Sequence, residues 1–476
     1  MCQREVKCWD SSAVLVPRCV RFSGERRSRQ TLTARRYNPT ISSAMTEGIF
    51  VRRPRAGFIT LGCKVNQYES ARIAEELWER GFDIAGDDEP LDVCVVNTCS
   101  VTQVAAAKSR NAIRRVRRRC PRALIVVTGC GTEADRSAVE SVPEIDLVVA
   151  NSEKDRIADY ILERFAGQGG FSLPHPRLEG GFLYNNGRVR ALLKVQDGCD
   201  NFCSYCIIPY TRGKPRSRPA QEVLEEAKRL AEAGYREVVV TGICIGAYDS
   251  GGLRLADLLG QLARIDGIER IRLSSIEPGD VDEALVELLR TEPRICRHLH
   301  LPLQSGDDDI LRAMNRPYTA AEYVRILDRV RSAVPELAVT TDVIVGFPGE
   351  TEEQFRRTVE LVESLRFAKV HVFPFSPRRG TPAVDMPDQV PQKEKDRRVH
   401  ELISVSEKLQ RDFAEGYVGR EVDVLVEGAR PKDGWAEGLT DTYLRVGFPC
   451  SESLEGQIVK VRVVSANSFG AEGEMV

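Results

Sequence analysis

The chain has 476 residues, of which 42% are hydrophobic and 29% are charged, and its formal net charge is −2. This composition is typical of a soluble globular protein of about three domains, and the small net charge restricts any nucleic-acid contact to local basic patches. No apolar run is long enough to span a bilayer, and 14 cysteines spread along the whole length do not fit a secreted disulfide framework, so we expect a cytoplasmic protein.

Residues 1–55 differ from the rest of the chain. The stretch through Ala44 is rich in arginine and serine, is poor in acidic residues and has no sustained hydrophobic period, so the sequence predicts a disordered extension. A transit peptide has this composition, and so has an upstream stretch before a start at Met45, which we favour. No apolar run followed by a small-residue cleavage site is found there, which argues against secretion.

Residues 56–168 alternate between strand-like and helical runs, which predicts a small parallel α/β sheet. The strand-like runs lie at 57–63, 92–99 and 123–130. Cys63, Cys99 and Cys130, the N-terminal cysteines, each end one of these runs. Because open parallel sheets bind ligands at the carboxyl edge, these three thiols can hold an iron–sulfur cluster with one iron left free. Three buried thiols are the alternative interpretation.

A second group consists of Cys199, Cys203 and Cys206, the loop cysteines, with the spacing Cys-x3-Cys-x2-Cys. Thiolates so spaced can hold three irons of a [4Fe–4S] cluster, and no further cysteine is near enough in sequence to hold the fourth. The spacing resembles that of radical S-adenosylmethionine (SAM) enzymes, in which the open iron binds SAM. A structural zinc site is the alternative, but it needs four ligands and no histidine is close in sequence.

Residues 185–410 repeat the alternation on a larger scale. The expected strands lie at 190–195, 237–241, 270–275, 298–303, 338–345 and 369–375. Six β/α units predict a partial parallel barrel with its chemistry at the carboxyl ends of the strands. Polar and turn-forming residues at these ends fit a bound ligand, although each of them alone is also explained by turn chemistry. They include Thr241, Gly242, Glu277, Gln304 and Gly346.

Residues 411–476 change character again. Short strand candidates at 421–427, 443–448 and 457–464, with turn signals between them, predict a small β-barrel. Barrels of this size are frequent RNA-binding modules, although a fold alone does not establish binding. The predicted fold class is therefore α/β, with a parallel α/β domain, a partial (β/α)6 barrel and a small C-terminal β-barrel.

Several motifs occur in a fixed order from Gly57 to the end of the chain. They are Gly62–Gln67, Asn97–Thr102, Thr128–Cys130, the loop cysteines, Leu299–Gly306 and Phe375–Ala383. The set resembles the radical-SAM methylthiotransferases. The form of the first motif, together with Asn315–Thr319, resembles the branch that acts on N6-threonylcarbamoyladenosine at position 37 of tRNA. The resemblance implies an N-terminal cluster domain, a radical-SAM core and a C-terminal TRAM domain that holds RNA.

The resemblance also implies a reaction in which a methylthio group replaces the C2 hydrogen of that adenine. An unactivated aromatic C–H is too weak an acid for a general base, so a radical route is needed. The loop cysteines would hold the cluster that cleaves SAM, and the N-terminal cysteines a second [4Fe–4S] cluster that carries the sulfur. Electrons must reach the cluster at low potential, which implies a flavodoxin or ferredoxin as electron donor. The residues expected at SAM are Tyr205, Thr241, Gly242, Glu277, Gln304, Asp342 and Gly346.

Basic residues are the candidates for substrate contact. The runs Lys108–Arg119 and Arg212–Arg218 can meet tRNA phosphates, although such runs are more often solvated helix faces. Arg316 or Arg378 is expected to pair with the carboxylate of the threonylcarbamoyl group, and a phosphate contact or a structural salt bridge explains either residue equally well. The remaining cysteines of this part of the chain are expected to be free thiols: Cys94, Cys120, Cys244, Cys296 and Cys450.

Three other functions stay open at this point. The same framework in sister branches modifies an isopentenyl-bearing adenine 37 of tRNA or an aspartate of a ribosomal protein, and the first motif and the C-terminal barrel favour the tRNA substrate considered above. The third is an iron–sulfur RNA-binding protein without catalytic activity. The formation of 5′-deoxyadenosine from SAM separates an enzyme from this third alternative.

Overall fold

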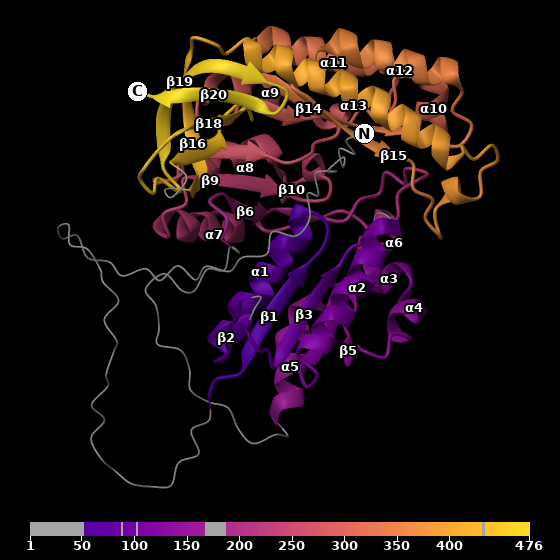
Figure 1. Ribbon diagram of the computed structural model, residues 1–476, viewed down its shortest axis with the longest axis vertical. Helices are drawn as coiled ribbons and strands as arrows, with labels where there is room; N and C mark the ends of the chain where they lie inside the picture. Colours follow the sequence, from indigo (N-terminus) through magenta and orange to yellow (C-terminus); the bar gives the residue numbers. More distant parts are fainter. Residues whose placement is uncertain (1–51, 87–88, 101–102, 167–186, 431–433) are drawn as a thin grey trace, which may run out of the picture.

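The computed structural model of the protein describes residues 52–86, 89–100, 103–166, 187–430 and 434–476. The predicted disordered extension lies outside the described residues, apart from its last few positions. Figure 1 shows an N-terminal α/β domain, a larger core and a C-terminal barrel in chain order. Within the described ranges, no helix combines the length and the apolar character that crossing a membrane requires.

The N-terminal domain is a five-stranded parallel sheet with the order β2-β1-β3-β4-β5. Every residue of the central strand β3 (Val93–Thr98) is buried, as expected for an apolar run covered by helices on both faces. The other strands are β1 (Arg55–Thr60), β2 (Asp83–Ile84), β4 (Leu124–Gly129) and β5 (Leu147–Val148). The helical segments are α1 (Lys64–Glu79), α2 (Gln103–Arg119), α3 (Cys130–Ala134), α4 (Arg136–Glu140), η1 (Asn151–Arg156) and α5 (Ile157–Ala166).

The core carries six parallel strands in two sheets of three, β6-β9-β12 and β13-β14-β15. Two isolated parallel bridges, Ile271 with Ile295 and Ser275 with His300, link β12 and its end to the chain at β13, so the expected partial barrel is confirmed. The strands are β6 (Ala191–Lys194), β9 (Glu237–Thr241), β12 (Arg270–Leu273), β13 (His298–His300), β14 (Ala338–Val345) and β15 (Lys369–Pro374). Their apolar side chains and the inward faces of the surrounding helices form one continuous hydrophobic core.

Helices enclose this barrel, and their ends are marked in the sequence. At the start of α11 the Thr319 hydroxyl accepts the N–H of Glu322 at 3.2 Å, and the Glu322 carboxylate accepts the N–H of Thr319 at 2.8 Å, which is a capping box. The longer helices are α7 (Ala220–Glu232), α8 (Leu255–Leu262), α9 (Glu283–Thr291), α11 (Ala320–Ala333), α12 (Glu352–Leu365) and α13 (Gln392–Glu415). The shorter ones are α6 (Ile208–Arg212) and α10 (Asp308–Ala313), and the turns η2 (Ile245–Ala247), η3 (Pro278–Asp280) and η4 (Pro382–Val384). Short strand pairs join β7 (Gln196–Asp197) to β8 (Arg216–Ser217) and β10 (Asp249–Ser250) to β11 (Leu253–Arg254).

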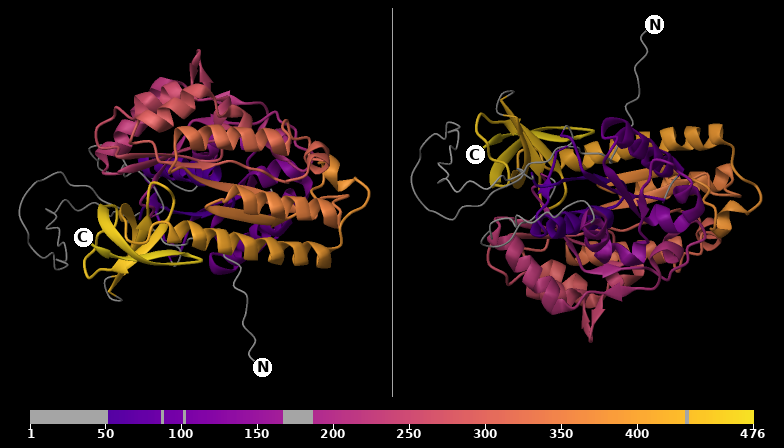
Figure 2. Two further views of the ribbon diagram at one scale, coloured as in Figure 1. Left: turned by 90° about the horizontal axis from the view of Figure 1, so that it is seen from above. Right: turned by 90° about the horizontal axis from the view of Figure 1, so that it is seen from below.

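The C-terminal segment is a closed five-stranded barrel, as expected, in the order β16-β17-β18-β20-β19. Its strands are β16 (Glu421–Arg430), β17 (Trp435–Leu439), β18 (Arg445–Pro449), β19 (Ile458–Asn467) and β20 (Gly470–Met475). Helix α13 runs along the core and leads into this barrel, as both views of Figure 2 show.

Two buried arginines of β12 fasten the barrel to the core. Arg270 donates hydrogen bonds to the carbonyl oxygens of Leu439 at 3.0 Å and Asp423 at 2.7 Å. Arg272 donates to the carbonyl oxygens of Asp441 and Thr440, both at 2.9 Å. The barrel is therefore held against the core through its main chain.

Candidate active site

The N-terminal cysteines meet at the carboxyl edge of their sheet. Cys63 caps α1 after β1, Cys99 follows β3, and Cys130 begins α3 after β4. The backbone at Gly62 has φ of +103°, and a Cβ placed there would come within 2.9 Å of the Cys99 sulfur. This turn therefore requires glycine and brings Cys63 beside Cys99. Cys99 and Cys130 are buried, whereas Cys63 has accessible surface.

Cys130 and Arg212 lie close enough to Cys63 to influence the pKa of its thiol. Burial raises the pKa of the Cys63 thiol, and the proximity of Cys130 raises it further, while the positive charge of Arg212 opposes the shift. Metal binding takes the place of the thiol protons, and the positive metal compensates the negative charges of the neighbouring thiolates.

The loop cysteines lie between β7 and α6. The Cys199 N–H donates to the Gly213 carbonyl at 3.0 Å, and the N–H of Ser204, next to Cys203, donates to Met314 at 3.0 Å. Burial, with a smaller contribution from the other two thiols, raises the pKa of Cys206 to about 12. The loop thus presents three thiols to one another, a soft donor set that suits iron.

Cys244, expected to be a free thiol, lies beside this group, three residues after β9 ends at Thr241. A hydrogen bond with the Cys244 thiol is the main reason that the pKa of Cys199 falls to about 7. Cys244 also lies 3.8 Å from a carboxylate oxygen of Asp280. The signal that sequence reasoning missed is the position of Cys244 in the turn that follows a barrel strand, where ligands are expected.

Most of the residues expected at SAM lie at or shortly after the carboxyl ends of the barrel strands, and Tyr205 lies in the loop of the cysteines. A Cβ on Gly242 would come within 3.0 Å of the Gln196 carbonyl oxygen, so the chain passes closely there. The Gly346 N–H donates to Glu350 at 2.6 Å, and Gln304 adopts a left-handed backbone with φ of 66°.

Tyr205 packs against an apolar cluster that includes Phe347, so its ring faces protein. Thr241 is buried at the end of β9, and Glu277 pairs with Arg316.

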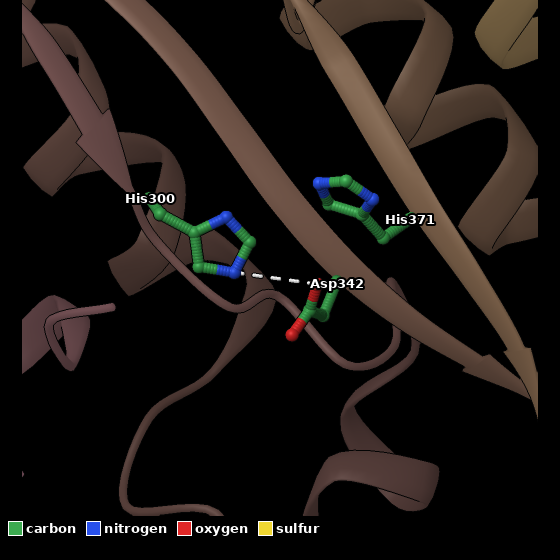
Figure 3. A group of neighbouring side chains, drawn as sticks. All are labelled: His300, Asp342 and His371. Carbon is green, nitrogen blue, oxygen red and sulfur yellow. Dashed lines mark ion pairs between the residues drawn. The ribbon is translucent and has the colours of Figure 1, made fainter. Parts of the chain in front are cut away.

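Asp342 belongs to a polar group inside the barrel, with His300 from β13 and His371 from β15 (Figure 3). His300 Nε2 lies 3.3 Å from Asp342 Oδ1, and its Nδ1 lies 2.9 Å from the Thr340 hydroxyl. One nitrogen or oxygen atom of each residue lies within 4.8 Å of those of the others, close enough to share a small cation or a polar ligand. Burial lowers the pKa of His371 to about 4, so its imidazole is neutral near pH 7.

Comparison with known proteins decides the family. Residues 55–150 match a family model described as "Uncharacterized protein family UPF0004", residues 193–362 match "Radical SAM superfamily" and residues 415–476 match "TRAM domain". The "Threonylcarbamoyladenosine tRNA methylthiotransferase MtaB" of Bacillus subtilis (strain 168) is 40% identical over 431 residues, which cover 88% of this chain and 96% of that protein. The chain belongs to the radical SAM methylthiotransferase family.

Another curated relative and a solved structure are consistent with this family and with the fold. The "tRNA-2-methylthio-N(6)-dimethylallyladenosine synthase" of Carboxydothermus hydrogenoformans (strain ATCC BAA-161 / DSM 6008 / Z-2901) is 35% identical, with 88% of this chain and 98% of that protein covered. Among solved structures, the radical S-adenosylmethionine methyltransferase TsrM of Kitasatospora setae has a TM-score of 0.53 at 16% identity, with 80% of this chain and 79% of that chain covered. This likeness shows a shared fold.

Family membership confirms the resemblance and the cofactors inferred from the sequence. The methylthiotransferase uses SAM and [4Fe–4S] clusters, and chemistry with two clusters is general for the family. Both groups of three cysteines fit such a cluster, because each supplies soft sulfur donors from one edge of its domain.

The structure distinguishes between the two arginines expected at the substrate. The Arg316 side chain of the methylthiotransferase is 1% exposed, is paired with Glu277, and donates to the Cys203 sulfur at 3.1 Å. This geometry favours the alternative of a structural salt bridge. Arg378 is half-buried close to Cys99, and both line a cavity of about 540 Å³ between the N-terminal domain and the core.

Sequence reasoning also missed Lys64, which directly follows Cys63. Burial lowers the pKa of the Lys64 ammonium, although its side chain retains accessible surface. Its positive charge helps to lower the pKa of His298, His371 and Tyr443. Its place immediately after Cys63 is the signal that could have identified it.

The two basic runs proposed for tRNA are partly structural in this methylthiotransferase. Arg117 donates to the carbonyl oxygens of Pro121 and Ala123, both at 2.9 Å, and pairs with Asp146. Arg212 is fully buried, so it is not a phosphate contact. Arg110 lines the 540 Å³ cavity with Arg378, and it remains a candidate for RNA contact.

Proposed function

We propose that the protein converts N6-threonylcarbamoyladenosine at position 37 of tRNA to its 2-methylthio derivative. The observation that carries the proposal is that each of two domains in contact presents three cysteines, with Arg212, just after the loop cysteines, bonded to Asn66, just after Cys63; a cavity that Cys99 and Arg378 line lies between the same two domains. The proposal is supported by the name of the Bacillus subtilis relative, because the match covers 96% of that relative's length. The proposed domains are residues 56–168, 185–410 and 411–476, and the proposed place of action is the cytoplasm.

The loop cysteines would hold one [4Fe–4S] cluster and the N-terminal cysteines the other. When bound, these groups and SAM supply the radical that removes the C2 hydrogen and the methylthio group that replaces it. A flavodoxin or ferredoxin is the proposed electron donor, because the cluster must be reduced at low potential.

The protein's own residues would position the reactants. Arg316 fixes Cys203 through the hydrogen bond to its sulfur, and Glu277 neutralises the buried guanidinium. Asp342 and Thr340 fix the orientation of the His300 ring. These polar side chains would then face the bound molecules. The helices around the barrel and the docked N-terminal domain would exclude bulk water, which protects a radical from side reactions.

The threonylcarbamoyl group carries a carboxylate, so its recognition requires a cation. We propose Arg378 for this role, because it faces the cavity beside Cys99 whereas Arg316 is already paired. The C-terminal barrel would hold the tRNA through phosphate contacts.

The test is an anaerobic reaction of the reconstituted protein with SAM, a reductant and three tRNAs. One tRNA carries threonylcarbamoyladenosine, one carries isopentenyladenosine and one carries unmodified adenosine at position 37. Nucleoside mass spectrometry should find the methylthio group on the first tRNA only, together with 5′-deoxyadenosine. Product on the isopentenyl tRNA alone would assign the protein to the sister branch, and the absence of 5′-deoxyadenosine with every tRNA would support a non-catalytic RNA-binding protein.

A further inference from the structure

Arg212 connects the two halves of the candidate active site. It ends α6, on the segment that follows the loop cysteines, and its side chain is fully buried against the N-terminal domain. One terminal nitrogen donates to Glu69 and to Asp197, each at 2.9 Å. The other donates to the side-chain oxygen of Asn66 at 2.7 Å.

Asn66 transmits this contact to two of the N-terminal cysteines. Its side-chain nitrogen donates to the carbonyl oxygen of Leu61 at 2.8 Å and to that of Thr98 at 3.0 Å. Leu61 precedes the glycine turn at Cys63, and Thr98 directly precedes Cys99. One guanidinium from the core therefore helps to hold both turns that carry these thiols.

The buried charges around Arg212 do not balance. Three cations, Arg212, Lys154 and Lys194, surround two carboxylates, Glu69 and Asp197, and no side chain of these five is more than 16% exposed. These five side chains sum to one positive charge, and they line a cavity of about 850 Å³ to which other acidic and basic side chains also contribute. An oxidised [4Fe–4S] core with three thiolate ligands carries one net negative charge and would compensate this positive charge.

The remaining donor of Arg212 points to the same conclusion. Its Nε is buried and has no hydrogen-bond partner among the described residues, whereas both terminal nitrogens are used. A buried donor without a partner is unfavourable unless a group that arrives later accepts its hydrogen bond. The charge of Arg212 reaches both Cys63 and Cys130, so the N-terminal cysteines lie within its influence.

We propose that Arg212 is a positioning residue for the cluster of the N-terminal cysteines: it fixes the edge that holds the cluster, balances the cluster's charge and donates its free Nε–H to the bound group. The inference rests on the proposed presence of that cluster, and it assigns to Arg212 a role in place of RNA contact.

The test isolates the N-terminal cluster in the full-length chain by replacing the loop cysteines with alanine. In this background, R212Q and R212K are compared with the native arginine after anaerobic reconstitution. The readouts are the iron content, the reduction potential and the electron paramagnetic resonance spectrum of the reduced cluster. Arg398→Gln serves as control, because Arg398 is an equally buried arginine that pairs with Glu350 in the core.

R212Q removes the positive charge, so its cluster should have a more negative potential and should lose iron to a chelator several-fold faster. R212K keeps the charge but cannot make the same fork of hydrogen bonds, so it should retain most of the potential and change the spectrum. R398Q should change neither. If R212Q does not fold, R212K decides: native potential, spectrum and iron retention in R212K would overturn the inference. Absence of iron from the background protein that keeps Arg212 would overturn the N-terminal cluster itself and this inference with it.

Discussion

Replacement of Arg272 by methionine should loosen the C-terminal barrel from the core. Arg272 is 2% exposed, donates to Glu237 at 2.7 Å, and donates to two barrel carbonyls at 2.9 Å. Breaking a buried ion pair from one side costs about 3–5 kcal/mol, but Arg190 and Arg270, at 3.9 and 4.0 Å from Glu237, moderate this to the lower end. Loss of partners for the two carbonyls adds about 2 kcal/mol. We therefore expect about 5 kcal/mol in total, more than a thousandfold in the opening equilibrium.

A double variant separates these two contributions. Replacing Glu237 and Arg272 together by methionine removes the unpaired carboxylate, while Arg190 keeps its pair with Glu427 and Arg270 keeps its two carbonyl acceptors, so most of the charge penalty should disappear and about 2 kcal/mol from the carbonyls should remain. Native-state hydrogen exchange of the barrel amides measures the free energy of opening in each variant. Arg264→Met, at an exposed position, is the control and should change it by less than about 0.5 kcal/mol. The reasoning is refuted if R272M behaves like this control, or if the double variant opens as readily as the single one.

Three further predictions concern the domain interface, the clusters and the substrate. Burial raises the pKa of Glu69, but Lys154, Arg212 and Lys194 outweigh it and hold the pKa well below its usual range. The stability that this gives is present above a pH of about 4.3, where the unfolded carboxyl ionises, and is lost below it, so the urea midpoint should fall as the solution is acidified. Glu69→Gln should flatten that fall, and an unchanged acid profile would contradict the assignment. Replacement of the loop cysteines by alanine should leave roughly half the iron and abolish 5′-deoxyadenosine, whereas replacement of the N-terminal cysteines should stop only sulfur insertion. Methylthio product from the second variant would show that those cysteines are merely structural. Arg378→Ala should narrow the difference in rate between tRNA with and without the threonylcarbamoyl group, while Arg379→Ala, its neighbour on the same cavity, should preserve it.

The parallel sheet and the partial barrel were predictable because their strands are short apolar runs with helical periods between them. The run at 92–99 became β3, which is buried on both faces and therefore has no polar alternation to confuse with another structure. In the C-terminal barrel, β17 and β20 were not among the predicted strands. Their sequences, Trp435–Leu439 and Gly470–Met475, contain glycine, alanine and glutamate, which have low strand propensity, so closure of the barrel decides their conformation.

The candidate site was predictable as a set of cysteines and not as a network. Arg212 lies in a basic run that resembles a phosphate-binding surface, but its partner Glu69 is 143 residues earlier in the chain. Arg316 likewise meets Cys203 across 113 residues. Local sequence shows that these side chains are cationic, and only the tertiary fold shows which anions or thiols surround them.

The attachment of the C-terminal barrel has a consequence for how this surface can change. All four hydrogen bonds from Arg270 and Arg272 to the barrel end on main-chain carbonyl oxygens, which every amino acid possesses. Substitutions at Asp423 or at 439–441 therefore leave these acceptors in place as long as the backbone keeps its path. The outer face of the barrel can therefore accumulate mutations without altering the angle at which it is presented to the catalytic core.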